Sequence, residues 1–308
     1  MAAAASSSEK KSPVSASLVV RGVVALAIVM IAFLANRQAW NGVRAELLAA
    51  RGVSEITQEG GLFVGMDKMK AALKLAPGNP EFGMELGSAL LKSENQKAAA
   101  NDLGSLDWSN LQQAHDYFLS VRETHPFPAT VYVKLAETSN MIATYLTIQK
   151  RDEERLRYSK ETVENYEKYI DIAGRPYDEP TLLYYPAIRR AQEVGRPDLA
   201  VNLHDDFARY FGEDAFKDKQ VVEVANYARM QIGEAPMAMA SIMRELRQDP
   251  TNGRMIGQAI VAARERGQAR NAALIFDMIE RLNLLSEELR GYQQELKELM
   301  DKEQKGKV

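Results

Sequence analysis

A histidine followed by two carboxylates is the arrangement in this sequence that most resembles an acid–base site. His204 precedes Asp205 and Asp206, and an imidazole beside carboxylates can act as a general base. The three residues fall in a predicted helix, where consecutive aspartates most simply form a solvated face. We therefore predict no catalytic residues and expect that the protein is not an enzyme.

Metal binding and covalent catalysis lack the residue types that they need. The chain has no cysteine, which excludes disulfides, thiolate metal sites, iron–sulfur clusters and a cysteine nucleophile. His115 and His125 share no metal-ligand spacing with His204. The glycines at Gly60-Gly61 and Gly78 belong to turns and match no phosphate-binding pattern. We expect no metal site and no cofactor.

The composition describes a chain that folds but has no basic character. Hydrophobic residues make up 46% and charged residues 26% of the 308 positions, so the chain can bury a sizeable apolar surface. Lys plus Arg is 39 and Asp plus Glu is 42, which gives a net charge of −3. A near-neutral chain lacks the electrostatic footprint of a nucleic-acid-binding protein. We predict no nucleic-acid partner.

The N-terminal region predicts a membrane anchor. Residues 1–17 are small and polar and predict a disordered tail, and residues 18–35 are apolar apart from Arg21. Eighteen helical residues span about 27 Å, close to the ~30 Å hydrocarbon layer, and Arg21 lies where its stem reaches the headgroups. The alternatives are a cleaved signal peptide, which Phe33 at the −3 position disfavours, and a buried core helix. We predict that residues 18–35 cross the lipid bilayer.

The basic residues on the two sides of this segment give only a slight preference for one orientation. Three lie before or at its start and three follow it: Lys10, Lys11 and Arg21, then Arg37, Arg44 and Arg51. The positive-inside rule does not separate equal counts. The pair of lysines in a very short tail favours a cytoplasmic N-terminus, with the rest of the chain outside the cytoplasm.

Three consecutive stretches after the anchor repeat one pattern. Residues 181–214, 219–252 and 253–286 each read as a helix, a glycine-containing turn and a second helix. Corresponding positions recur every 38 residues between the first two stretches and every 34 between the last two. Gly ends the first helix in a left-handed conformation, and Pro suits the start of the second.

The sequence here resembles the tetratricopeptide repeat (TPR) family, whose unit has about 34 residues. Upstream, the residues that carry the resemblance are Ala72 and Pro77 at the end of one unit, then Leu86-Gly87, Ala114, Phe118 and Pro126 in the next. The second of these units is 15 residues too long, and we expect the excess to form a polar loop within residues 91–108. The resemblance covers roughly residues 46–286. The alternative is an irregular all-α domain with coincidental spacing.

The resemblance implies an all-α, TPR-like α-solenoid of about six helical hairpins, with one N-terminal transmembrane helix. We place the repeat domain at residues 36–286 and a capping helix and tail at residues 287–308. Apolar residues from Leu282 to Leu299 recur at steps of three and four, which fits a cap or, alternatively, a short homodimeric coiled coil.

In the TPR family the first helices of the hairpins form a concave face that holds a peptide. The matching positions imply four peptide-binding residues in this chain: Tyr185, Arg189, Tyr227 and Arg254. Two amphipathic rings and two planar cations suit a peptide with acidic and apolar residues. The alternative is that Tyr185 and Tyr227 pack between repeats. Val133 and Glu223 replace the Lys and Asn of the family members that clamp chaperone C-termini, so that specialised activity is not predicted.

These observations predict a membrane-anchored scaffold or adaptor that binds a protein or peptide through a TPR-like concave groove. Two alternatives stay open. The chain could be an accessory subunit of a larger membrane complex, or a membrane-anchored hydrolase that depends on carboxylates alone.

Overall fold

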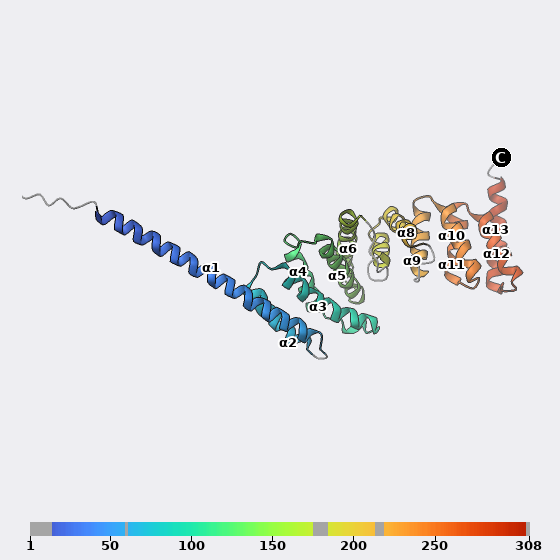
Figure 1. The fold of residues 1–308 in the computed structure, drawn as a ribbon. Helices are drawn as coiled ribbons and strands as arrows, with labels where there is room; N and C mark the ends of the chain where they lie inside the picture. The colour runs from blue at the N-terminus through green and yellow to red at the C-terminus, as the bar shows by residue number, and fades with distance from the viewer. Residues whose placement is uncertain (1–13, 59–60, 175–183, 213–218, 306–308) are drawn as a thin grey trace, which may run out of the picture. The chain divides into compact units, whose positions relative to one another are not determined.

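The chain folds into helices throughout its described part. The computed structural model describes residues 14–58, 61–174, 184–212 and 219–305, and every regular element in these ranges is helical (Figure 1). The elements are α1 (Val14–Ile56), α2 (Leu62–Leu75), α3 (Pro80–Ala99), η1 (Leu103–Ser105), α4 (Trp108–Val121), α5 (Pro128–Ile148), α6 (Asp152–Ala173), α7 (Tyr184–Glu193), α8 (Pro197–Phe211), α9 (Lys219–Gln231), α10 (Ala235–Gln248), α11 (Gly253–Arg266), α12 (Ala269–Arg281) and α13 (Glu287–Lys305).

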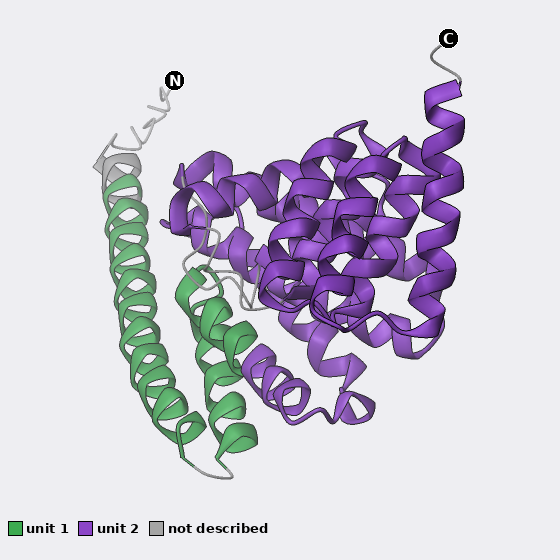
Figure 2. Ribbon diagram, turned by 90° about the vertical axis from the view of Figure 1, so that its right-hand side faces the viewer, with its two compact units in different colours: residues 1–89 green, residues 90–308 purple. Residues whose placement is uncertain are grey.

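The helices pack in chain order as antiparallel hairpins. From α4 to α13 each helix contacts the next, and α1 packs along α2. The first helices of successive hairpins also contact each other, in the series α5–α7, α7–α9, α9–α11 and α11–α13. This sequential packing is the all-α, TPR-like arrangement that the repeats predict. The chain forms two compact units, residues 1–89 and residues 90–308, and α3 runs from one into the other (Figure 2).

The hairpin turns form where the glycines predict them. Gly195, Gly233 and Gly267 have φ of 74°, 90° and 65°, and each lies between the two helices of a hairpin. This left-handed conformation costs little only for glycine, which is why the turn requires it. Pro197 and Pro236 then occupy the first turn of the second helices α8 and α10.

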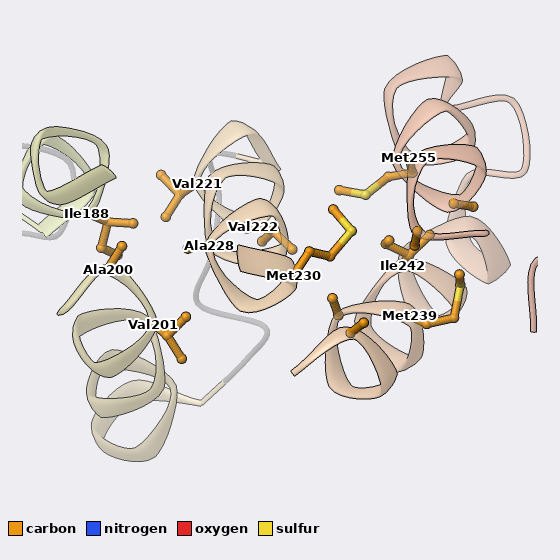
Figure 3. Close-up of a cluster of buried hydrophobic side chains, with 14 of the residues drawn as sticks. Ile188, Ala200, Val201, Val221, Val222, Ala228, Met230, Met239, Ile242 and Met255 are labelled. Atoms are coloured by element: carbon orange, nitrogen blue, oxygen red, sulfur yellow. The ribbon is translucent and has the colours of Figure 1, made fainter. Parts of the chain in front are cut away.

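The core of the larger unit is built from small residues at the helix crossings and bulky residues beside them. Ala200, Ala238 and Ala272 are fully buried in α8, α10 and α12, where a larger side chain would push the two helices of a hairpin apart. Figure 3 shows Ala200 beside Ile188 from the preceding helix. Side chains from α7 to α12 belong to one continuous buried cluster, so each hairpin is stabilised by its neighbours.

The predicted polar loop at residues 91–108 is wrong over its first half, which continues α3 as far as Ala99. The reason is a buried carboxylate, since Glu94 is fully buried yet has three hydrogen-bond donors. These donors are the backbone N–H of Asp107, Asn110 Nδ2 and Lys97 Nζ, each at 2.8 Å. A carboxylate with this many donors can be buried without an uncompensated desolvation cost, so a polar segment remains helical.

In the smaller unit, α1 is one helix of 43 residues, about 65 Å long at 1.5 Å per residue. It begins at Val14, within the predicted tail, and it has no break at residue 36, where the anchor was expected to give way to the repeats. Residues 1–13 of that tail lie outside the described residues. The C-terminal half of α1 packs closely on α2, since a Cβ atom on Gly65 would lie 2.5 Å from the carbonyl oxygen of Gly52.

The N-terminal part of α1 has the length and apolar composition of a membrane span. Its mean hydropathy over an 18-residue window is 1.8, and none of that window is buried in the protein. A signal sequence near the N-terminus has the same properties.

The last helix, α13, packs against α11 and α12. Leu296 is buried and belongs to the core cluster. The partly buried residues that pack against this cluster include Leu285, Leu289, Tyr292 and Leu299. The apolar side of α13 therefore packs against the last hairpin.

Candidate functional site

The exposed residues of α5, α7, α9, α11 and α13 form a surface that we call the first-helix face. Three of the polar pairs between successive helices of this face join residues that are 31 positions apart. They are Arg189 Nη2 to Gln220 Oε1 at 3.1 Å, Arg254 Nη1 to Glu223 Oε2 at 3.5 Å, and Arg264 Nε to Glu295 Oε1 at 2.6 Å. The face is therefore continuous from α7 to α13.

The four predicted binding residues do not share one environment. Tyr227 on α9 is 47% exposed, which suits contact with a ligand. Arg254 on α11 is exposed, but its charge is offset by Glu223. Arg189 on α7 is partly buried, and its Nη2 donates to Gln220 Oε1 on α9.

Tyr185 requires a correction, because only 3% of its surface is exposed. Its ring lies edge-on to Phe207, with ring centroids 6.2 Å apart, inside the hairpin of α7 and α8. Tyr185 packs between helices, and it is not available to a ligand.

A pocket of about 340 Å³ opens beside Arg189, between η1, α5 and α7. Its lining residues are Leu103, Asn140, Thr144, Thr147, Ile148, Pro186, Arg189, Arg190 and Glu193. Leu103, Ile148 and Pro186 give it an apolar wall, and Arg189 gives it a cation. The sequence analysis missed Leu103 because this residue fell in the expected polar loop.

The polar wall of this pocket is held together by Arg190, which is buried. Its Nε donates to Asn140 Oδ1 at 3.0 Å and its Nη2 donates to Thr144 Oγ1 at 2.9 Å, both on α5. Its Nη1 pairs with Glu193 at 2.9 Å. Glu193 also accepts hydrogen bonds from Ser159 at 2.9 Å and pairs with Arg155 at 3.1 Å, both on α6. This network joins α7 to both helices of the preceding hairpin.

A second pocket, of about 420 Å³, lies between the second helices α6 and α8 and is acidic. Its carboxylates are Glu164, Glu167, Asp171 and Asp206. Glu167 pairs with both terminal nitrogens of Arg196, at 2.8 and 3.2 Å, and Asp206 pairs with Arg209 at 2.9 Å. Two of the four carboxylates in this pocket are thus paired with arginines.

His204, the histidine next to the two aspartates, is buried and lines neither pocket. His204 Nδ1 donates to Asp205 Oδ1 at 3.0 Å, and Asp205 also forms an ion pair with Arg229. Burial lowers the pKa of His204, an effect that the hydrogen bond to Asp205 opposes and nearby Arg229 reinforces. Burial alone would raise the pKa of Asp205, but His204 and Arg229 lower it overall. The group is a structural contact between α8 and α9.

The lowered pKa of His204 predicts that the protein loses stability as the pH falls. An unfolded histidine has a pKa of about 6.5, so below that pH the unfolded chain binds a proton that the folded chain still resists. Stability is therefore full above about pH 6.5 and falls as the pH drops toward the folded pKa. We expect His204→Gln to flatten the dependence of the urea midpoint on pH between 7 and 5. Equal slopes for the variant and the natural protein would contradict this account.

Comparison with known proteins finds little. No protein-family model matches the chain, and no curated protein matches it. Among solved structures, the chain is similar to a tetratricopeptide repeat protein from Parabacteroides merdae ATCC 43184. The two share 15% sequence identity with a TM-score of 0.29, over 83% of this chain and 99% of that one. The class of this protein, an all-α protein of TPR-like helical hairpins, therefore rests on its own packing.

Proposed function

We propose that this protein is a membrane-anchored scaffold that binds another protein through the first-helix face. The observation that supports the proposal is the unbroken series of contacts between first helices from α5 to α13, together with the pocket beside Arg189. Surfaces of this kind bind extended or helical segments of partners.

The chemistry of the surface favours a segment with apolar and acidic side chains. The wall of Leu103, Ile148 and Pro186 accepts an apolar group. Arg189 offers a planar cation to a carboxylate, and the exposed ring of Tyr227 offers an amphipathic contact. Arg254 contributes as an aligned polar group, since Glu223 already offsets its charge.

Residues 18–35 form the anchor in this proposal, with the N-terminus cytoplasmic and the repeat domain outside the cytoplasm. The support is the exposed apolar stretch of α1 and its length. A permanent accessory subunit of a membrane complex would use the same anchor and the same face, and differs only in the lifetime of the contact.

Removing residues 1–35 is expected to move both the protein and its partner out of the membrane. The apolar stretch makes no contribution to the core, so residues 36–308 should stay helical by circular dichroism. The measurement is fractionation after an alkaline wash, followed by capture of the tagged chain and mass spectrometry. With the full chain the partner sediments with the membrane, and with the shortened chain it is recovered in the soluble fraction. A full-length chain that washes off the membrane would show that the apolar stretch does not cross the bilayer.

A further inference from the structure

The part of α1 that follows the predicted span has an apolar stripe that α2 does not cover. Ala45, Ala49 and Gly52 are buried against α2 on one side of the helix. On the opposite side Trp40, Val43 and Leu47 are 63%, 52% and 57% exposed. Since these three residues are spaced by three and four, they lie along one face.

The stripe extends too far from the span to be covered by lipid. Val43 and Leu47 lie 8 and 12 residues beyond Ala35, or about 12 and 18 Å along the helix axis. The interfacial layer on one side of a bilayer is only about 5–8 Å thick. Trp40 falls within that layer, but Leu47 lies in water unless another protein surface covers it.

The stripe continues a seven-residue pattern that begins inside the span. A coiled coil has two seam positions in each heptad, a and d. Position a is occupied by Leu26, Phe33, Trp40 and Leu47, and position d by Val29, Asn36, Val43 and Ala50. The pattern lasts three and a half heptads, which is long enough for a coiled coil. All of these residues are exposed on α1.

We propose that α1 pairs with α1 of a second copy of this chain, in a parallel coiled coil with Leu26–Ala50 as its seam. The inference rests on the proposed anchor, because two copies that cross the same bilayer with the same orientation must run parallel. In a parallel pair, a residue on one edge of the seam faces the residue five positions later on the partner helix. Glu46 and Arg51 are five apart, lie on opposite edges and are both exposed.

The charges along the seam fit this occupant. Arg37, Arg44 and Arg51 repeat every seven residues along one edge, and Glu46 lies on the other. The pairing brings Glu46 of each copy to Arg51 of the other, so the two-fold symmetry forms two ion pairs. Within its own chain, Glu46 accepts a hydrogen bond from Asn79 Nδ2 at 3.2 Å through Oε1, so Oε2 is the oxygen that would accept from Arg51 of the second copy.

The absence of cysteine from the sequence makes the pairing directly testable. Val43→Cys and Leu47→Cys place single thiols on the seam, and Gln38→Cys places one on an exposed position off the seam. A disulfide forms only if the two Cα atoms come within about 7 Å. Each purified full chain is reconstituted at high dilution in phosphatidylcholine vesicles, oxidised and separated without reducing agent. We expect a two-chain band for the seam variants and none for Gln38→Cys.

The charge pair supplies a second measurement. Glu46→Arg in the Leu47→Cys background should lower the yield of the two-chain band about fivefold, because it replaces two attractions by repulsions. Adding Arg51→Glu should restore the yield. Equal cross-linking at all three cysteine positions, or no cross-linking at the seam positions, would overturn the pairing. The pairing would also be overturned if the seam cysteines formed a disulfide only in native membranes and only with a different protein. Release of the protein by an alkaline wash would overturn the anchor, and the pairing with it, while retention without seam cross-links would overturn the pairing alone.

Discussion

Replacing Arg190 with methionine is expected to lower the free energy of unfolding by about 3 kcal/mol. Methionine keeps most of the length of the side chain but removes every donor of the guanidinium. Asn140 and Thr144 lose their partner on α7, and Glu193 loses one of its two cations. Since these contacts join α7 to the hairpin of α5 and α6, the loss affects the continuity of the first-helix face. The measurement is urea unfolding of the full chain in detergent, followed by circular dichroism.

The neighbouring residue provides the matched control. Arg189→Met makes the same chemical change one position earlier on the same helix, where the side chain is only partly buried. We expect it to cost about 1 kcal/mol or less. Equal costs at the two positions would mean that the Arg190 network does not hold these helices together.

The sequence predicted the helices and their turns because these depend on local signals. Gly195, Gly233 and Gly267 mark helix ends that the structure confirms with positive φ. A glycine that stops a helix acts through its own backbone, so no knowledge of distant contacts is needed.

The helical extension of α3 could not be predicted in the same way. The run from Lys92 to Ala99 is polar, and it is helical because Glu94 finds donors on a segment more than ten residues later. The signal that was available lies in Leu103 and Leu106, two apolar residues in a stretch that was interpreted as a loop. Leu106 is buried and Leu103 lines the pocket.

The candidate site was predicted only in part. Tyr185 and Arg189 lie on the same helix, and spacing alone places both on one face. The structure buries Tyr185 because its ring packs against Phe207 of α8. The three polar pairs at a separation of 31 residues were also not predicted, since the repeats are visible in apolar positions, which recur every 34 or 38 residues.

Changing Tyr227 and Arg189 together is expected to abolish partner capture while leaving the fold intact. Tyr and Arg are the residue types that contribute most at protein interfaces, and loss of two such contacts weakens binding by about a hundredfold. Tyr227 is exposed on α9 and Arg189 lines the pocket on α7, so neither truncation opens a cavity in the core. The double variant Tyr227→Ala with Arg189→Ala should therefore keep the helical signal and the melting temperature of the natural protein.

The chain offers a control of the same composition on a second helix. Tyr210 and Arg209 are both exposed on α8, which does not belong to the first-helix face. Tyr210→Ala with Arg209→Ala removes the same two side-chain types there. The decisive measurement is capture of the partner from detergent-solubilised membranes by both tagged double variants, compared by quantitative mass spectrometry. The proposal predicts loss of the partner with the change on α7 and α9 and full capture with the change on α8. Full capture by a folded Tyr227→Ala, Arg189→Ala chain would contradict it.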